Sequence, residues 1–240
     1  MAAELFMEFK RIFLKLHEKQ DLNFLSHYFI HHKIGNPYFN LGLILPDLAR
    51  GSIKKYKELN GDFSINHEHM LNGCFTHLED DKKFHSSHFF ETGTAICIDA
   101  IKSNADLKNI ERKWFLGHIL FEMMMDRLLI RHYQGIGKQF YADLNLIDIS
   151  ELDGFFKNQG LLETESLCRM FHHFREAGYI LNYTDNNLFG YSLTRVMMRA
   201  GLPEISFHER RDLLKSVLDL EENWFGEVYS RIFEMKQIFE

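Results

Sequence analysis

The stretch "HILFEMMMDRLLIRHY", residues 118–133, decides the fold class, because it belongs to a long predicted helix spanning Leu107 to Tyr133. Apolar residues fill most of its positions, and ionisable residues recur every four residues at His118, Glu122 and Asp126. Residues four apart lie on one side of an α-helix. Such a stripe on an apolar helix indicates either a structural ion-pair network or a set of metal ligands, and both alternatives stay open.

The helical period of apolar residues continues along most of the chain. A helix beginning near Ser64 has one apolar side, formed by Met70, Leu71, Cys74, Phe75 and Leu78. Ser206 and Glu209 have the spacing of a capping box at the start of the last long helix. Further helices are predicted within residues 1–20 and at residues 23–33, 40–50, 92–103, 136–146, 150–158, 163–178 and 187–200. Because no linker or repeat interrupts this pattern, the sequence predicts one compact all-α domain over residues 1–240.

The composition argues against several classes of protein. The formal net charge is −6, so the chain has no overall field that attracts nucleic acid. Its three cysteines lack CxxC spacing and predict reduced core residues rather than a disulfide framework. No run of 18 uncharged apolar residues occurs, and the first residues do not resemble a signal peptide. These features predict a soluble, cytoplasmic protein without a membrane span.

Two shorter motifs place acids where they need a positive partner. In "HLEDD", His77 and Asp81 are four residues apart, so both side chains can reach one point from a helix. In "LGLILPDLARG", residues 41–51, Asp47 is the only acid in an otherwise apolar run. A buried carboxylate is costly unless a cation compensates it. If Asp47 pairs only with Arg50, it forms an ordinary salt bridge on a helix surface.

Five segments in order resemble the acyl carrier protein phosphodiesterase family, a relative of the HD-type metal phosphohydrolases. They are "LNFLSH" (22–27), "LGLILPDLARG" (41–51), "CFTHLEDD" (74–81), "DRLLIRHY" (126–133) and "WFGEVYSRIFEM" (224–235). The resemblance implies an all-α, multi-helix domain of the HD phosphohydrolase type over residues 22–235. Residues 1–20 are then a helical extension, which either covers core surface or mediates formation of a homo-oligomer.

The resemblance also implies an activity, which is removal of 4′-phosphopantetheine from holo acyl carrier protein with a divalent metal. Mn²⁺ is the expected metal, with Mg²⁺, Fe²⁺ or Zn²⁺ as alternatives. The family's functionally important acid falls on Asp47, and His132 is the expected acid for the leaving serine oxygen. The implied metal ligands are His27, Asp47, His77, Asp81 and Asp126. Additional candidate ligands are His88, His118 and Glu122, and either His85 or His88 could take over a ligand role.

Basic residues near Asp47 suit an acidic carrier protein. The expected contacts to phosphate and carrier protein are Arg50, Arg131, Lys54 and Lys55. The chain departs from the family pattern after His77, because Leu78 and Glu79 occupy the positions of two family arginines. Two alternatives therefore remain. One is an HD-like phosphohydrolase acting on a small phosphoester or nucleotide, and the other is a non-catalytic descendant that binds carrier protein or another partner.

Overall fold

The computed structural model describes residues 24–49, 52–53, 55–59, 61, 63–104, 112–199 and 201–239. The predicted helical extension at residues 1–20 lies outside this range, as do Arg50, Gly51 and Lys54. The beginning of the long helix predicted from Leu107 also lies outside it.

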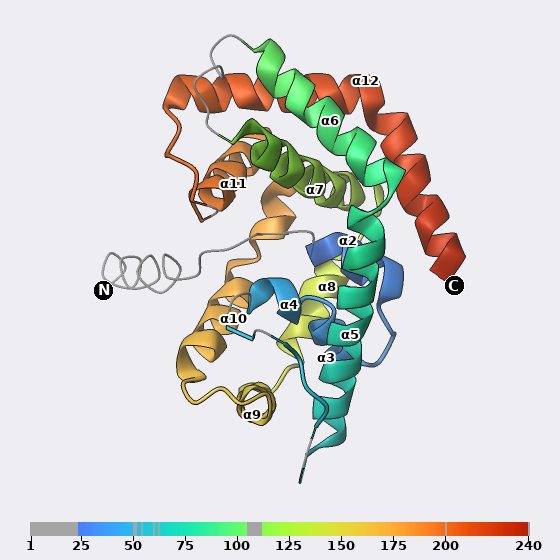
Figure 1. The fold of residues 1–240 in the computed structure, drawn as a ribbon, viewed down its shortest axis with the longest axis vertical. Helices are drawn as coiled ribbons and strands as arrows, with labels where there is room; N and C mark the ends of the chain where they lie inside the picture. The colour runs from blue at the N-terminus through green and yellow to red at the C-terminus, as the bar shows by residue number, and fades with distance from the viewer. Residues whose placement is uncertain are drawn as a thin grey trace.

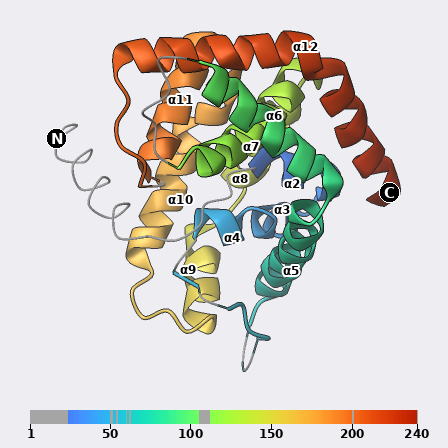
Figure 2. The same cartoon turned by 45° about the horizontal axis from the view of Figure 1, so that its top comes forward.

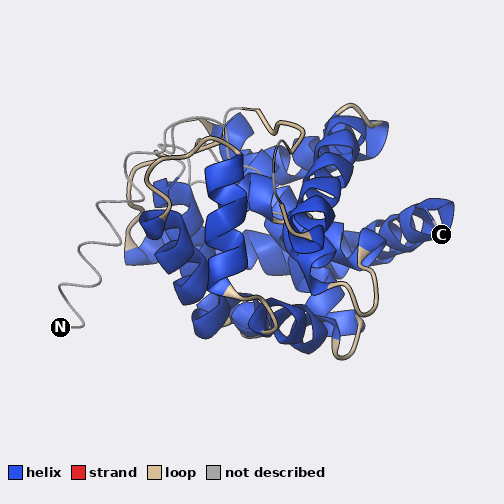
Figure 3. Cartoon of the chain, turned by 90° about the horizontal axis from the view of Figure 1, so that it is seen from below, coloured by secondary structure: helices blue, strands red, loops and turns tan. Residues whose placement is uncertain are grey.

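Within the described residues the chain is helical and contains no strand, which confirms the predicted all-α class (Figure 3). The elements are α2 (Phe24–His31), α3 (Pro37–Gly42), α4 (Leu45–Leu48), α5 (Ile65–His85), α6 (His88–Ser103), α7 (Lys113–His132), α8 (Ile136–Asn145), α9 (Ile149–Asn158), α10 (Glu165–Ala177), the 3₁₀ helix η2 (Tyr179–Thr184), α11 (Asn186–Arg199) and α12 (Phe207–Phe239). None of the described helices is long and apolar enough to cross a lipid bilayer.

Side-chain caps explain where several helices begin. The Ser64 hydroxyl accepts a hydrogen bond from the His67 amide at the start of α5. The predicted capping box is present at α12, where the Ser206 amide donates to Glu209 and the Glu209 amide donates to the Ser206 hydroxyl. These bonds satisfy amides that have no partner within the first turn of a helix. The predicted starts near Ser64 and Ser206 are therefore confirmed.

The single helix predicted at residues 40–50 is wrong, because the chain forms two short helices there. α3 ends at Gly42, and α4 starts at Leu45 with Pro46 in its first turn. Proline has no amide hydrogen to donate and clashes with a preceding helical turn, so it is tolerated only at a helix start. The break turns the chain between Leu43 and Leu45 and carries Asp47 on the second helix.

The buried side of α5 also differs from the prediction. Met70 and Cys74 are buried as expected, but Phe75 and Leu78 are 41% and 43% exposed. The side that faces inward includes Gly73 and His77 instead. Close approach of another backbone at Gly73 sets the rotation of the helix, which leaves the two large apolar residues outside.

Buried apolar side chains from α2 through α12 form one continuous cluster. In Figure 1, α7 lies under α6 and α12, while α5 extends to the other end of the molecule. Figure 2 shows α2, α3 and α4 between α7 and α5, and contacts join α2 to α7 and both α3 and α4 to α5. The short helices therefore connect the two long ones.

Two glycines allow α3 and α5 to meet through their backbones. A Cβ added to Gly73 would lie 2.2 Å from the Phe39 carbonyl oxygen and 2.8 Å from the Gly42 Cα atom. A Cβ added to Gly42 would lie 2.2 Å from the Met70 carbonyl oxygen. Real Cβ atoms do not approach backbone atoms so closely, and backbone cannot move aside as a flexible side chain can. Only glycine fits at these two positions.

We expect Gly73→Ala to lower the free energy of unfolding by about 3 kcal/mol, because overpacking a rigid contact forces α3 and α5 apart. Urea denaturation measures this loss. Gly190→Ala in α11 is the matched control, since the nearest atom to its added Cβ is 3.8 Å away. That control should leave stability unchanged or raise it by up to about 1 kcal/mol through helix propensity. A Gly73→Ala variant as stable as the parent protein would contradict this account.

Candidate metal centre

Asp47 faces a histidine in the interior of the protein. Its side chain is only 5% exposed, and Oδ1 lies 3.5 Å from Nε2 of His77. The other ring nitrogen of His77, Nδ1, lies 2.8 Å from the Leu43 carbonyl oxygen. Because a carbonyl oxygen only accepts, Nδ1 carries the hydrogen and donates it. This bond turns Nε2 of His77 toward Asp47, so Asp47 is not an ordinary salt-bridge residue on a helix surface.

His27 and Asp81 complete a group around His77. The rings of His27 and His77 are 4.1 Å apart between centroids, with their planes inclined by 39°. One ligand atom from each of His27, His77 and Asp81 lies within 4.8 Å of the other two. Neutral imidazole and carboxylate are ligands that Mn²⁺, Fe²⁺ and Zn²⁺ accept. The predicted residues of α2 and α5 are thus brought together in a geometry that fits a metal ion, with Asp47 beside them.

Opposing effects act on the pKa of His77. Burial lowers this pKa, but the carboxylates of Asp47 and Asp81 and the Leu43 carbonyl together raise it above its ordinary value. The imidazole therefore sits in a negative environment created by two acids. An environment that favours a proton on His77 also favours a metal cation in its place, because both respond to the same carboxylates.

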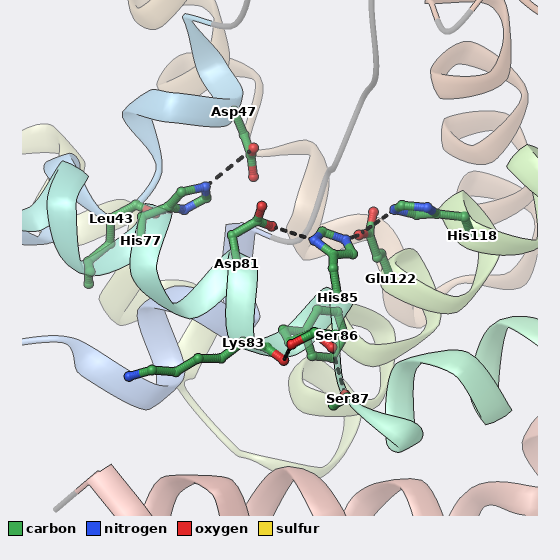
Figure 4. A network of polar contacts seen from close by, with 11 residues as sticks. Leu43, Asp47, His77, Asp81, Lys83, His85, Ser86, Ser87, His118 and Glu122 are labelled. Atoms are coloured by element: carbon green, nitrogen blue, oxygen red, sulfur yellow. Dashed lines mark hydrogen bonds and ion pairs between the residues drawn. The ribbon is translucent and has the colours of Figure 1, made fainter. Parts of the chain in front are cut away.

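A second group continues from Asp81 (Figure 4). Asp81 Oδ1 lies 3.1 Å from Nδ1 of His85, and Nε2 of His85 lies 3.1 Å from Oε1 of Glu122. Nε2 of His118 lies 2.8 Å from the same Glu122 oxygen. Ligand atoms of His85, His118 and Glu122 also lie within 4.8 Å of one another. The two groups form one row of polar side chains from α4 through α5 to α7.

Aromatic rings enclose this second group. The Phe90 ring lies 4.5 Å from the His85 ring and 4.8 Å from the His118 ring, both measured between centroids. Glu122 is 1% exposed, whereas the side chains of His85 and His118 are 22% and 18% exposed. A buried carboxylate beside apolar rings is poorly hydrated and needs a positive partner. Solvent reaches the group through the two histidines.

Asp126 has a different environment from the one predicted. Its carboxylate accepts hydrogen bonds from the Leu25 amide at 3.1 Å and from the Ser26 amide and hydroxyl at 2.9 and 3.0 Å. Burial raises the pKa of Asp126 to about 7, and these hydrogen bonds act in the opposite direction. Asp126 therefore caps the start of α2 from α7 and positions His27, the next residue along α2. It belongs to neither group of converging ligand atoms.

The remaining predicted site residues lie apart from the two groups. Arg131 pairs with Glu221 of α12, at 2.7 Å, rather than facing the centre. His132 is exposed at the end of α7, ten residues beyond Glu122 and therefore about 15 Å further along the helix axis. The side chain of His88 is 93% exposed and faces Glu91, and Lys55 is exposed. Arg50 and Lys54 are outside the described residues.

The sequence offers His85 or His88 as a residue that could take over a ligand role, and the structure places His85, not His88, in the centre. His85 connects the two groups, and it follows His77 and Asp81 at intervals of four residues along α5. The same spacing had drawn attention to the stripe in α7. His85 thus continues the "HLEDD" motif by four residues, and residues at these intervals share one side of a helix.

Comparison with protein-family models, curated proteins and solved structures found no match. The resemblance to the acyl carrier protein phosphodiesterases therefore stays a prediction from the sequence motifs.

We expect Asp126→Ala to lower the free energy of unfolding by about 3 kcal/mol, because it leaves buried amides at the start of α2 without their acceptor. Chemical denaturation of the metal-free protein measures this loss. Asp185→Ala is the matched control, since Asp185 caps α11 through the Leu188 amide at an exposed position. Its loss should cost about 1 kcal/mol, because water replaces the bond there. Equal losses in the two variants would contradict the buried-cap role of Asp126.

Proposed function

We propose that this protein is a metal-dependent phosphodiesterase that releases 4′-phosphopantetheine from holo acyl carrier protein. The observation that carries the proposal is the convergence of His27, His77 and Asp81 beside the buried Asp47. The family resemblance implied these same residues as ligands, although they come from segments up to 54 positions apart in the sequence. On this proposal the helices form an HD-type phosphohydrolase fold, and the chain works in the cytoplasm with its carrier protein.

The reaction consumes one water, breaks the bond between phosphorus and the serine oxygen, and leaves a serine hydroxyl and free phosphopantetheine. A divalent metal would supply Lewis acidity, which polarises phosphoryl oxygens and makes water more acidic. The chain's own residues fix the site that receives it. The Leu43 carbonyl holds the ring of His77, and Asp126 holds the start of α2 and thereby His27. Hydrogen bonds of this kind orient metal ligands before the metal binds.

The proposal leaves out two roles expected from the sequence, those of His132 and Arg131. The exposed position of His132 at the end of α7 gives no reason to make it the acid for the leaving serine oxygen. Arg131 faces Glu221, so contacts to phosphate fall to the basic residues that follow Asp47 in the sequence. Those residues also suit an acidic carrier protein, because opposite charge steers the two proteins together.

A second candidate function has support from the surface of α5. Leu78 is 43% exposed, and the side chain of Glu79 is 70% exposed and pairs with Lys83 at 2.7 Å. Neither Leu78 nor Glu79 offers a positive charge to an acidic protein, and Glu79 pairs with the nearby cation of Lys83. A small phosphoester needs fewer surface contacts than a carrier protein. This surface therefore favours hydrolysis of a small phosphoester as the alternative.

The test is release of phosphopantetheine from holo acyl carrier protein with Mn²⁺, followed by mass spectrometry of the carrier. We expect turnover by the parent protein and a loss of at least about 100-fold in kcat/KM for Asp47→Ala. Removing groups that only support a metal ligand already costs about 10–100-fold. His88→Ala is the matched control, because it removes an exposed histidine outside both groups and should retain full activity.

The outcomes separate the candidate functions. Mn²⁺-dependent cleavage of bis(p-nitrophenyl) phosphate without release from the carrier would support the small-phosphoester alternative. Equal activity of the parent and Asp47→Ala proteins would contradict the proposed centre. No cleavage of either substrate, with no bound metal, would favour the partner-binding alternative.

A further inference from the structure

We propose that the centre holds two divalent cations, the second bound by His85, His118 and Glu122. The inference rests on the proposed function only in placing both ions at the same catalytic centre. It concerns how many ions the protein binds, which can be measured without any substrate.

The geometry of the second group matches that of the first. Its three ligand atoms lie within 4.8 Å of one another, as in the group of His27, His77 and Asp81. Both groups consist of two imidazoles and one carboxylate, a set that Mn²⁺, Fe²⁺ and Zn²⁺ accept. Three protein ligands leave coordination positions open, as in catalytic metal sites. Because His85 and His118 are partly exposed, an ion can reach the buried Glu122 from solvent.

Asp81 connects the two sites. It belongs to the first group, and its Oδ1 lies 3.1 Å from Nδ1 of His85. Nε2 of His85 is then directed at Glu122 and available to an ion. A metal-binding histidine typically donates its other N–H to a carboxylate, which fixes the ring and makes it a stronger ligand. Asp81 thus acts as a ligand in one site and as a positioning residue in the other.

The ring of His85 also separates the two ions. Its two nitrogens face opposite neighbours, Asp81 on one side and Glu122 on the other (Figure 4). An ion bound at Nε2 therefore lies on the far side of the ring from the first group. This arrangement differs from close two-metal sites, in which the ions are about 3.5–4 Å apart. We infer two neighbouring ions, each with its own ligands.

The charges of the two groups and of the adjacent Asp47 favour two ions over one. Asp47, Asp81 and Glu122 carry three negative charges when ionised. One divalent cation leaves these carboxylates with a net charge of minus one, which repels a phosphodiester. A second divalent cation changes the net charge to plus one, which attracts it. On this count, the second ion is what makes the centre attractive to a phosphodiester.

The test is the number of Mn²⁺ ions bound per chain, measured by isothermal titration calorimetry on the metal-free full-length protein. We expect two ions for the parent protein and one for both Glu122→Gln and His118→Ala. His77→Ala should lose the other ion and also retain one. His88→Ala is the matched control and should bind two, which shows that exposed histidines do not contribute to the count.

Asp81→Asn tests the connection between the sites. Because Asp81 contacts both groups, this variant should weaken both binding events at least about 10-fold, whereas each single-site variant affects one. Circular dichroism identifies any variant that fails to fold. If His118→Ala fails to fold, Glu122→Gln still tests the second site, since it keeps the shape of a buried side chain.

The results distinguish failure of this inference from failure of the proposed function. A parent protein that binds one ion, lost in His77→Ala and retained in Glu122→Gln, would overturn the second site and leave the proposed function standing. Two bound ions without release of phosphopantetheine would overturn the function and leave the two-ion centre standing. A parent protein that binds no ion would overturn both.

Discussion

The contact between Gly42 and Gly73 is the constraint on which the candidate centre depends. It brings the backbones of α3 and α5 together one residue before Leu43 and one helical turn before His77. At this separation the Leu43 carbonyl can accept the hydrogen bond from His77, and the ring turns toward Asp47. A larger side chain at either glycine would separate these groups. The geometry of the polar residues thus follows from a contact between residues without side chains.

The polar residues of α7 serve mainly to hold other helices in place. Asp126 caps α2, and its neighbour Arg127 is fully buried, with hydrogen bonds to Asn186 and to the Tyr183 carbonyl and an ion pair to Glu221 at 3.0 Å. Each charge is compensated by several partners, as a buried charge requires. Glu122, in contrast, is the acid of α7 that faces the candidate centre.

The sequence predicted the helices well, because apolar periodicity and caps act locally. The family resemblance named His27, Asp47, His77 and Asp81 as ligands, and the structure brings these side chains together, while their role in binding metal stays a prediction. Long-range contacts were harder to foresee. Nothing near Asp126 in the sequence indicates that its partners are the amides of Leu25 and Ser26, and i, i+4 spacing cannot distinguish a cap from a ligand. The inward side of α5 was predicted from hydrophobicity, but close packing at Gly73 decided it.

The separation of the ligands along the chain has a consequence for folding. His27 comes from α2 and Glu122 from α7, and each acts with partners from α5. Unlike a zinc finger, whose ligands lie close together in sequence and whose metal drives folding, this centre cannot assemble locally. A chain emerging from the ribosome must therefore release α7 and dock it against α5 before the centre is complete. If the proposed centre holds metal, the protein acquires it after folding, and metal binding then reports that the helices have reached their final arrangement.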